Sequence, residues 1–296
     1  MLIHRQKILL ALLDAFGGKQ TATDFQKYLF LYTTNCEKEK SYDFVPYKFG
    51  CFSFQAAVDK RRLIEKGHLN DSDSWEIVKS DISYSHQLKK GEPQKIERFV
   101  NNFKSIKGKK LIHHVYTEYP YFAIHSQIAE VTLSADELSL VKNSKPTKRR
   151  TRLLATIGYE GGSIENYLNR LIINDIRLLV DVRKNPISRK YGFSKNTLAR
   201  LSASVGVDYI HIPELGIESS DRKNLATQSD YERIFKTYEL TVLKEQGAAL
   251  RELLALHKSN RRIALTCFEK EHSQCHRSRV VNKLLELDRA LEVTHL

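Results

Sequence analysis

The C-terminal half of the chain alternates short apolar runs with amphipathic segments, and this alternation restricts the possible folds more than any other feature. The runs LLATIGY, IRLLVDV, DYIHI, RIALTCF and LEVTHL are apolar and partly β-branched, which predicts strands. The segments between them have helical spacing, and the longest predicts one helix over residues 231–257. Strands and helices in alternation indicate a parallel sheet covered on both faces. We therefore predict a Rossmann-like α/β domain over residues 153–296.

Residues 1–141 have a different, mostly helical pattern. HRQKILLALLDAF has helical spacing and stops at a Gly-Gly pair, and Thr21 or Thr23 is placed to cap a second helix, DFQKYLFLYTT. After a turn at VPYKFG, the segment SFQAAVDKRRLIEKG predicts a third helix, and the strand-like WEIV follows it. Three short helices and a β segment are the order of a winged helix, whose third helix faces the major groove of DNA. We predict a winged-helix-like domain here.

The segment KNSKPTKRRTR, residues 142–152, separates the two parts. Ser, Pro and Thr interrupt six basic residues, and no apolar residue offers a contact to a core, which is typical of a linker.

The 296 residues carry a formal charge of +13, which attracts polyanions. Nucleic acid, and DNA rather than RNA, is the leading partner, although a solvated lysine-rich surface would give the same charge. The candidate nucleic-acid-binding residues are Lys60, Arg61 and Arg62 on the predicted third helix, and Arg149 and Arg150 in the linker. The alternative for the helix is a basic face exposed only to water.

The sequence predicts a cytoplasmic protein without a membrane segment. No window approaches the roughly 18 consecutive apolar residues of a membrane span, and the N-terminus lacks the cleavage site of a signal peptide. In a reducing compartment, cysteines are free, metal-bound or reactive more often than paired in disulfides. This interpretation applies to Cys36, Cys51, Cys267 and Cys275.

Polar residues follow the predicted strands, at the edge where ligands bind in open α/β sheets. The residues concerned are Gly158, Tyr159, Glu160 and Gly161; Asp181 and Arg183; His211 and Glu214; and Cys267, Glu269, Cys275, His276 and Arg277. The loop GYEGGS is either a tight turn or a phosphate site at a helix N-terminus. Asp181 and Arg183 form either a structural ion pair or a phosphate-binding arginine beside a catalytic carboxylate.

The stretch ALTCFEKEHSQCHRSRV concentrates thiols and imidazoles. Cys267, His272, Cys275 and His276 could supply four zinc ligands, but the spacing lacks a C-x-x-C pair and Arg277 is adjacent, so we expect neither a metal nor another cofactor. We expect residues 275–277 to begin a helix, where the macrodipole lowers a thiol pKa and favours anions. Cys267 resembles the thiolate of rhodaneses and cysteine phosphatases, without the closely spaced arginine, or it is a small buried residue.

Taken together, TIGYEG, LLVDVRKNPISR, YIHIPELG and CFEKEHSQCHR resemble the signature segments of the domain of unknown function 488 family, over about residues 153–295. The resemblance implies a compact α/β domain with these motifs in one pocket. Members of the family commonly have His where this chain has Tyr159. The segment VYTEYPYFAIHS is similar to the helical extension of longer members, which suggests a targeting or nucleic-acid-binding module.

These features lead to the hypothesis of a nucleic-acid-directed enzyme that attacks a glycosidic bond, as a DNA glycosylase does, or a phosphodiester bond, in repair or phage defence. Asp181 and Glu269 would be the acid/base pair, while Tyr159, Cys267 and His276 would transfer protons or orient the substrate. The expected substrate- and phosphate-binding residues are Gly158, Gly161, Arg183, Glu214, Cys275 and Arg277. The alternatives are a DNA-binding regulator that senses a nucleotide or redox state, and a rhodanese-like enzyme with an exposed, acidic Cys267.

Overall fold

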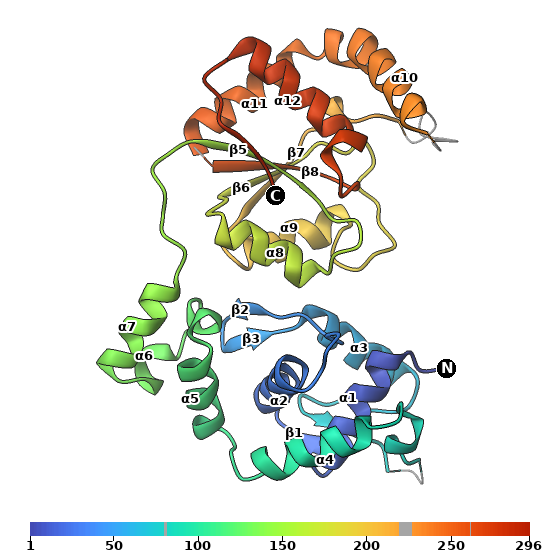
Figure 1. The fold of residues 1–296 in the computed structure, drawn as a ribbon, viewed down its shortest axis with the longest axis vertical. Coiled ribbons are helices and arrows are strands. Elements are labelled where there is room, and N and C mark those ends of the chain that lie inside the picture. Colours follow the sequence, from blue (N-terminus) through green and yellow to red (C-terminus); the bar gives the residue numbers. More distant parts are fainter. Residues whose placement is uncertain (80–81, 219–226, 261) are drawn as a thin grey trace. The chain divides into compact units, whose positions relative to one another are not determined.

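The computed structural model describes residues 1–79, 82–218, 227–260 and 262–296, which form two compact units, Met1–Lys145 and Pro146–Leu296 (Figure 1). Helix α7 (Ala135–Ser144) ends the first unit. It includes residues 142–144, which we had assigned to the linker. A capping box between Ser134 and Glu137 starts this helix, and Val141 is buried, so the helix is stabilised at its start and near its end.

The N-terminal unit is mostly helical. Its helices are α1 (His4–Ala15), α2 (Ala22–Asn35), α3 (Phe54–Glu65), α4 (Glu92–Phe103), α5 (Lys109–Glu118), α6 (Ala129–Thr132) and α7, with 3-10 turns at Ser85–Gln87 and Pro120–Ala123. Strand β1 (Lys19–Gln20), between α1 and α2, pairs antiparallel with β4 (Trp75–Glu76), which follows α3. A bridge between Leu69 and Ile77 adds the third segment of the small sheet. The predicted three helices and following strand are therefore present in this order, with β1 and the strands β2 (Val45–Tyr47) and β3 (Gly50–Phe52) as additions.

Local signals start and stop these helices as the sequence predicts. The backbone N–H of Gly17 donates to the carbonyl of Asp14, and Gly17 has a φ of 90°, which ends α1. The hydroxyls of Thr21 and Ser53 accept from backbone N–H groups and cap α2 and α3. Of the two threonines considered for α2, Thr21 is thus the cap.

The segment VPYKFGCF is a hairpin, and the sequence predicted only its turn. Strands β2 (Val45–Tyr47) and β3 (Gly50–Phe52) pair antiparallel around a two-residue loop. Gly50 has a φ of 96°, which only glycine adopts freely, and a Cβ there would meet the Tyr116 ring at 2.6 Å. Short strands of three residues carry too little alternation to be recognised from the pattern alone.

The C-terminal unit is a five-stranded parallel sheet between two layers of helices. The strands are β5 (Leu153–Gly158), β6 (Leu178–Asp181), β7 (Asp208–His211), β8 (Arg262–Cys267) and β9 (Val293–His295), in the order β7-β6-β8-β5-β9. The helices are α8 (Ile164–Ile173), α9 (Lys195–Ala203), α10 (Gln228–Tyr238), α11 (Gly247–Asn260) and α12 (His276–Leu287). All five predicted strands are present and parallel.

Right-handed crossovers explain which helices cover which face. From β5 the chain moves through α8, β6 and α9 to the edge strand β7, and it then returns through β8 to β9 at the other edge. Because crossovers are right-handed, reversing the direction of travel moves the helices to the opposite face. Figure 1 shows α8 and α9 on one face and α11 and α12 on the other.

The helix predicted over residues 231–257 is two helices in the structure. Helix α10 passes into a π-helical turn (Glu239–Leu243), and α11 begins only at Gly247. The buried side chains of Leu243, Leu250 and Leu253 join the core under the sheet. Breaking the helix lets both pieces pack on that core, whereas a straight helix would leave it.

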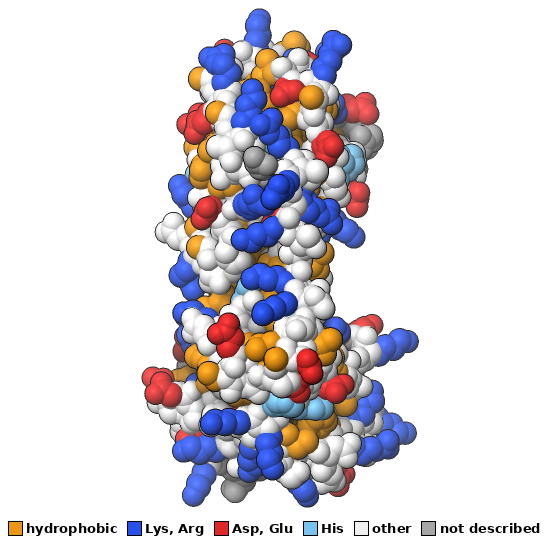
Figure 2. Space-filling model, turned by 90° about the vertical axis from the view of Figure 1, so that its left-hand side faces the viewer, with side chains coloured by type: hydrophobic (Ala, Val, Ile, Leu, Met, Phe, Trp, Pro, Cys, Tyr) orange, Lys and Arg blue, Asp and Glu red, His pale blue; other side chains and the backbone are white. Residues whose placement is uncertain are grey.

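Basic side chains are widely distributed over the surface. Figure 2 shows one face, on which Lys and Arg lie on both units and Asp and Glu are interspersed among them. Among the described residues, the structure has no helix with the length and hydropathy needed to cross a bilayer.

Candidate active site

A cavity of about 470 Å³ lies at the carboxyl ends of β5, β6 and β8. Tyr159 after β5, residues from the segment 183–188 after β6, and residues 267–269 at the end of β8 form its wall, together with Ile217 and Tyr231. The neighbouring strands β5 and β8 are followed by helices on opposite faces of the sheet, which opens a crevice between the two loops. This is the place where open α/β sheets bind ligands.

Asp181 and Arg183 form a buried ion pair beside this cavity. The Arg183 guanidinium donates to Asp181 through Nε at 2.8 Å and Nη2 at 2.5 Å, and the Arg183 backbone N–H donates at 3.1 Å. The Tyr209 hydroxyl donates to the same carboxylate at 2.6 Å. Burial acts to lower the pKa of Arg183, but the hydrogen bonds and charge of Asp181 outweigh it and raise that pKa. Asp181 and Arg183 therefore form a buried ion pair, and Arg183 also lines the cavity.

Tyr159 connects this ion pair to an aromatic wall. Its hydroxyl accepts from Arg183 Nη1 at 2.8 Å, and its ring stacks on Phe193 with centroids 4.2 Å apart. Phe268 meets the Tyr159 ring edge-on at 5.3 Å. Burial raises the pKa of Tyr159, so its hydroxyl keeps its proton at neutral pH. The cavity thus has aromatic rings beside a fixed guanidinium.

Glu269 is a carboxylate of the cavity wall that lies outside the ion pair. Its Oε2 accepts from the Cys267 thiol at 3.1 Å. The loop that carries Glu269 is fixed from two sides: the Arg277 guanidinium donates to the carbonyls of Glu269 at 2.5 Å and Lys270 at 2.9 Å, and Gly158 packs against the same backbone. A Cβ on Gly158 would lie 1.9 Å from the carbonyl oxygen of Glu269, so only glycine fits.

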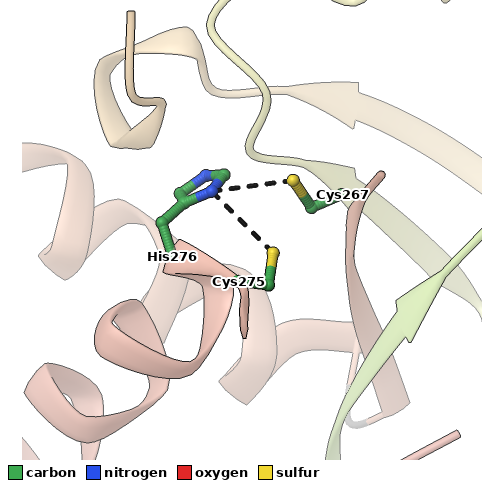
Figure 3. A group of neighbouring side chains, drawn as sticks. All are labelled: Cys267, Cys275 and His276. Atoms are coloured by element: carbon green, nitrogen blue, oxygen red, sulfur yellow. Dashed lines mark hydrogen bonds between the residues drawn. The ribbon is translucent and has the colours of Figure 1, made fainter. Parts of the chain in front are cut away.

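Three side chains form a cluster at the cavity wall: Cys267, Cys275 and His276. All three are completely or almost completely buried. His276 Nδ1 lies 3.6 Å from the Cys267 sulfur and 3.9 Å from the Cys275 sulfur (Figure 3). His276 Nε2 lies 2.9 Å from the carbonyl oxygen of Val182. Because a carbonyl only accepts, Nε2 carries a proton, and Nδ1 is the ring nitrogen that faces the sulfur atoms.

Two expectations about the thiols need correction. Cys275 caps helix α12, which starts at His276, but burial raises the pKa of the Cys275 thiol well above its ordinary value, whereas we expected a lowered pKa. Cys267 lies in the cavity wall without any surface exposed to solvent, contrary to what a rhodanese-like nucleophile requires. His272, which we had grouped with the three cluster residues, instead stacks on His295 with centroids 3.7 Å apart.

Other predicted site residues lie away from the cavity. Glu214 is exposed in the turn after β7, and Gly161 has a φ of 73° in the turn after β5, as a tight turn requires. Arg149 and Arg150 are exposed in the segment before β5.

The basic residues of α3 differ from one another. Lys60 donates to the carbonyl of Ser72 at 2.7 Å and lies over the Trp75 ring, so it holds the loop before β4. Arg62 lies 3.9 Å from the buried carboxylate of Asp59. Arg61 is exposed, which leaves it the best placed of the three for an external partner.

Sequence reasoning missed several residues of the cavity. Lys184, Asn185 and Ser188 come from the segment KNPISRK, which we quoted without assigning roles, and Tyr231 comes from α10. Ser188 is held by Ser194, whose hydroxyl donates to the Ser188 carbonyl at 3.0 Å. Lys184, Asn185 and Ser188 lie in a polar segment directly after a predicted strand, which was a usable signal. Tyr231 reaches the cavity only through the tertiary fold, so no sequence signal indicated it.

Comparison with known proteins gives one match. Residues 163–284 match the family described as Domain of unknown function DUF488. No curated protein and no solved structure is significantly similar to the chain. The match runs from the cap of α8 into α12, so it includes the ion pair, the loop of Glu269 and the thiol–imidazole cluster. The C-terminal unit therefore contains a domain of the DUF488 family.

Proposed function

We propose that the C-terminal unit hydrolyses a bond within a nucleotide of DNA, and that Glu269 is its catalytic carboxylate. The observation that carries the proposal is the position of Glu269 in a cavity that also offers aromatic rings and basic groups. The glycosidic bond is the preferred target, as in a DNA glycosylase. Such an activity would belong to repair or phage defence in the cytoplasm.

The hydrogen bonds of Asp181 favour cleavage of a glycosidic bond with Glu269 as the principal catalytic carboxylate. Arg183 and Tyr209 donate four hydrogen bonds to its oxygens, so Asp181 is held as the partner of Arg183. Glu269 is then left to act as the base that activates water or as the charge that stabilises an oxocarbenium-like transition state.

The cavity has the size and the chemistry for a nucleotide. Its volume of about 470 Å³ falls in the range of small-molecule sites, roughly 300–1,000 Å³. Phe268 and Tyr159 supply faces or edges on which a base can stack. Lys184, whose ammonium lies 3.4 Å from Glu218 at the surface, is placed to meet a phosphate. A base displaced from the duplex would enter such a pocket, as in other enzymes that act on bases.

The N-terminal unit would supply the affinity for DNA. In the predicted winged-helix-like domain, α3 would face DNA, and Arg61 is exposed on that helix. Phosphate contacts by exposed arginine and lysine side chains give binding that weakens as salt is added. In this proposal, the excess positive charge of the chain serves to bind DNA.

The test incubates the protein with labelled DNA, plain or containing modified bases, with and without Mg²⁺. Products are analysed before and after alkali, because base excision leaves an abasic site that breaks only in alkali. We expect alkali-dependent breaks with the wild type and their loss with Glu269→Gln. Glu271→Gln is the matched control, since Glu271 is exposed two residues away, and it should retain activity.

Other outcomes separate the alternatives. Direct nicking that needs Glu269 would mean phosphodiester hydrolysis at the same site. Tight, salt-sensitive binding without any product would contradict the enzyme and favour the DNA-binding regulator. Product formation that survives Glu269→Gln would remove Glu269 from the mechanism.

A further inference from the structure

The cluster of Cys267, Cys275 and His276 brings three soft ligand atoms together from two elements. Cys267 ends strand β8, while Cys275 caps helix α12 and His276 is its first residue. The two sulfur atoms and Nδ1 all lie within 4.8 Å of one another (Figure 3). Both sulfur atoms face the same nitrogen, at 3.6 Å and 3.9 Å. A cation held between the three atoms could be bound by all of them.

We propose that Cys267, Cys275 and His276 bind a zinc ion. In tetrahedral zinc sites the Zn–S distance is about 2.3 Å and the Zn–N distance about 2.0–2.1 Å, which separates sulfur from nitrogen by roughly 3.6 Å. The Cys267 separation of 3.6 Å equals this spacing, and the Cys275 separation of 3.9 Å is slightly longer. Two thiolates and an imidazole are a ligand set that zinc prefers.

The support around the imidazole is that of a metal ligand. The carbonyl of Val182 accepts from Nε2 at 2.9 Å, which fixes the tautomer and leaves Nδ1 as the donor atom to a metal. Val182 follows β6, and β6, β8 and β5 are neighbours in the sheet. The ends of these three strands surround the cluster or the adjoining cavity. Rigid elements hold the ligand atoms before any ion arrives.

Charge balance favours zinc at this buried place. Binding displaces the two thiol protons to solvent, and a Zn²⁺ ion with two thiolates and a neutral imidazole has no net charge. Arg277, which had argued against a cation from its position in the sequence, directs its Nη atoms to the carbonyls of Glu269 and Lys270.

The first experiment measures zinc in untagged protein purified without chelators. We expect about one zinc per chain, and replacement by Co²⁺ should give the charge-transfer absorption of thiolate ligands and the visible bands of a tetrahedral site. Cys275→Ser and His276→Ala should each lower zinc affinity by about tenfold or more. The matched controls are His272→Ala, next to the cluster but outside it, and Cys36→Ser in the N-terminal unit; both should retain zinc.

Three results would overturn the proposal. These are metal-free protein that binds no Co²⁺, metal retained without thiolate charge transfer, and a Cys267–Cys275 disulfide in freshly isolated protein. If a variant fails to fold, as circular dichroism would show, the Co²⁺ spectrum of the wild type still decides. The inference does not rest on the proposed function: zinc content is measured without substrate, whereas Glu269→Gln tests catalysis, so either can fail alone.

Discussion

Replacing Asp181 by Asn tests whether this carboxylate supports the fold. The substitution keeps the size of the side chain and removes its charge, which leaves the Arg183 guanidinium buried without its counter-ion. Breaking a buried ion pair by changing one partner costs about 3–5 kcal/mol. Arg183 keeps hydrogen bonds to Tyr159 and to the carbonyl of Phe193, both at 2.8 Å, so we expect a value at the lower end, about 3 kcal/mol.

Equilibrium unfolding in urea measures this change, and the chain provides an internal control. Its one tryptophan, Trp75, is buried in the N-terminal unit, so fluorescence follows that unit while circular dichroism follows both. The fluorescence transition should stay in place, and the part of the circular dichroism transition that belongs to the C-terminal unit should move to lower urea.

Two further variants sharpen the test. Tyr209→Phe removes one hydrogen bond to the charged carboxylate and should cost about 1.5–3 kcal/mol. The double variant Asp181→Asn with Arg183→Met should cost less than the sum of its single changes, because neither partner is left charged and alone. If Asp181→Asn lowers the free energy of unfolding by less than about 1 kcal/mol and also abolishes DNA cleavage, the structural role is refuted. Asp181 would then again be a candidate for the catalytic acid/base pair with Glu269.

Three further predictions follow from individual contacts. Gly158→Ala would place a Cβ 1.9 Å from the Glu269 carbonyl oxygen and should destabilise the C-terminal unit by about 1–3 kcal/mol in thermal unfolding; an unchanged transition would contradict the close approach. Burial lowers the pKa of His257, so below about pH 6.5 the unfolded state binds more protons than the folded state. Unfolding measurements should therefore give a smaller free energy of unfolding at pH 5 than at pH 7. The difference between the two pH values should be smaller in His257→Gln. Arg61→Gln should weaken DNA binding and reduce the salt dependence by about one phosphate contact, and unchanged titrations would remove α3 from the interface.

The sequence by itself determined the elements of the C-terminal unit and the edge at which its site lies. Apolar runs such as RIALTCF are long enough to identify a buried strand, and parallel strands have their carboxyl ends at one edge. For this reason Tyr159, Arg183 and Glu269 could be named before their positions were known. Local caps such as Thr21 were also readable, because they depend on neighbours within one turn.

Only the tertiary structure decided which of these groups meet. The strand order placed the Tyr209 hydroxyl of β7 on the Asp181 carboxylate, where it adds to the hydrogen bonds from Arg183. The same order placed the Val182 carbonyl at the His276 imidazole, although 94 residues separate them, and left His272 on His295. Spacing along the chain constrains contacts within a turn or a strand, whereas contacts between strands depend on the packing of the whole sheet.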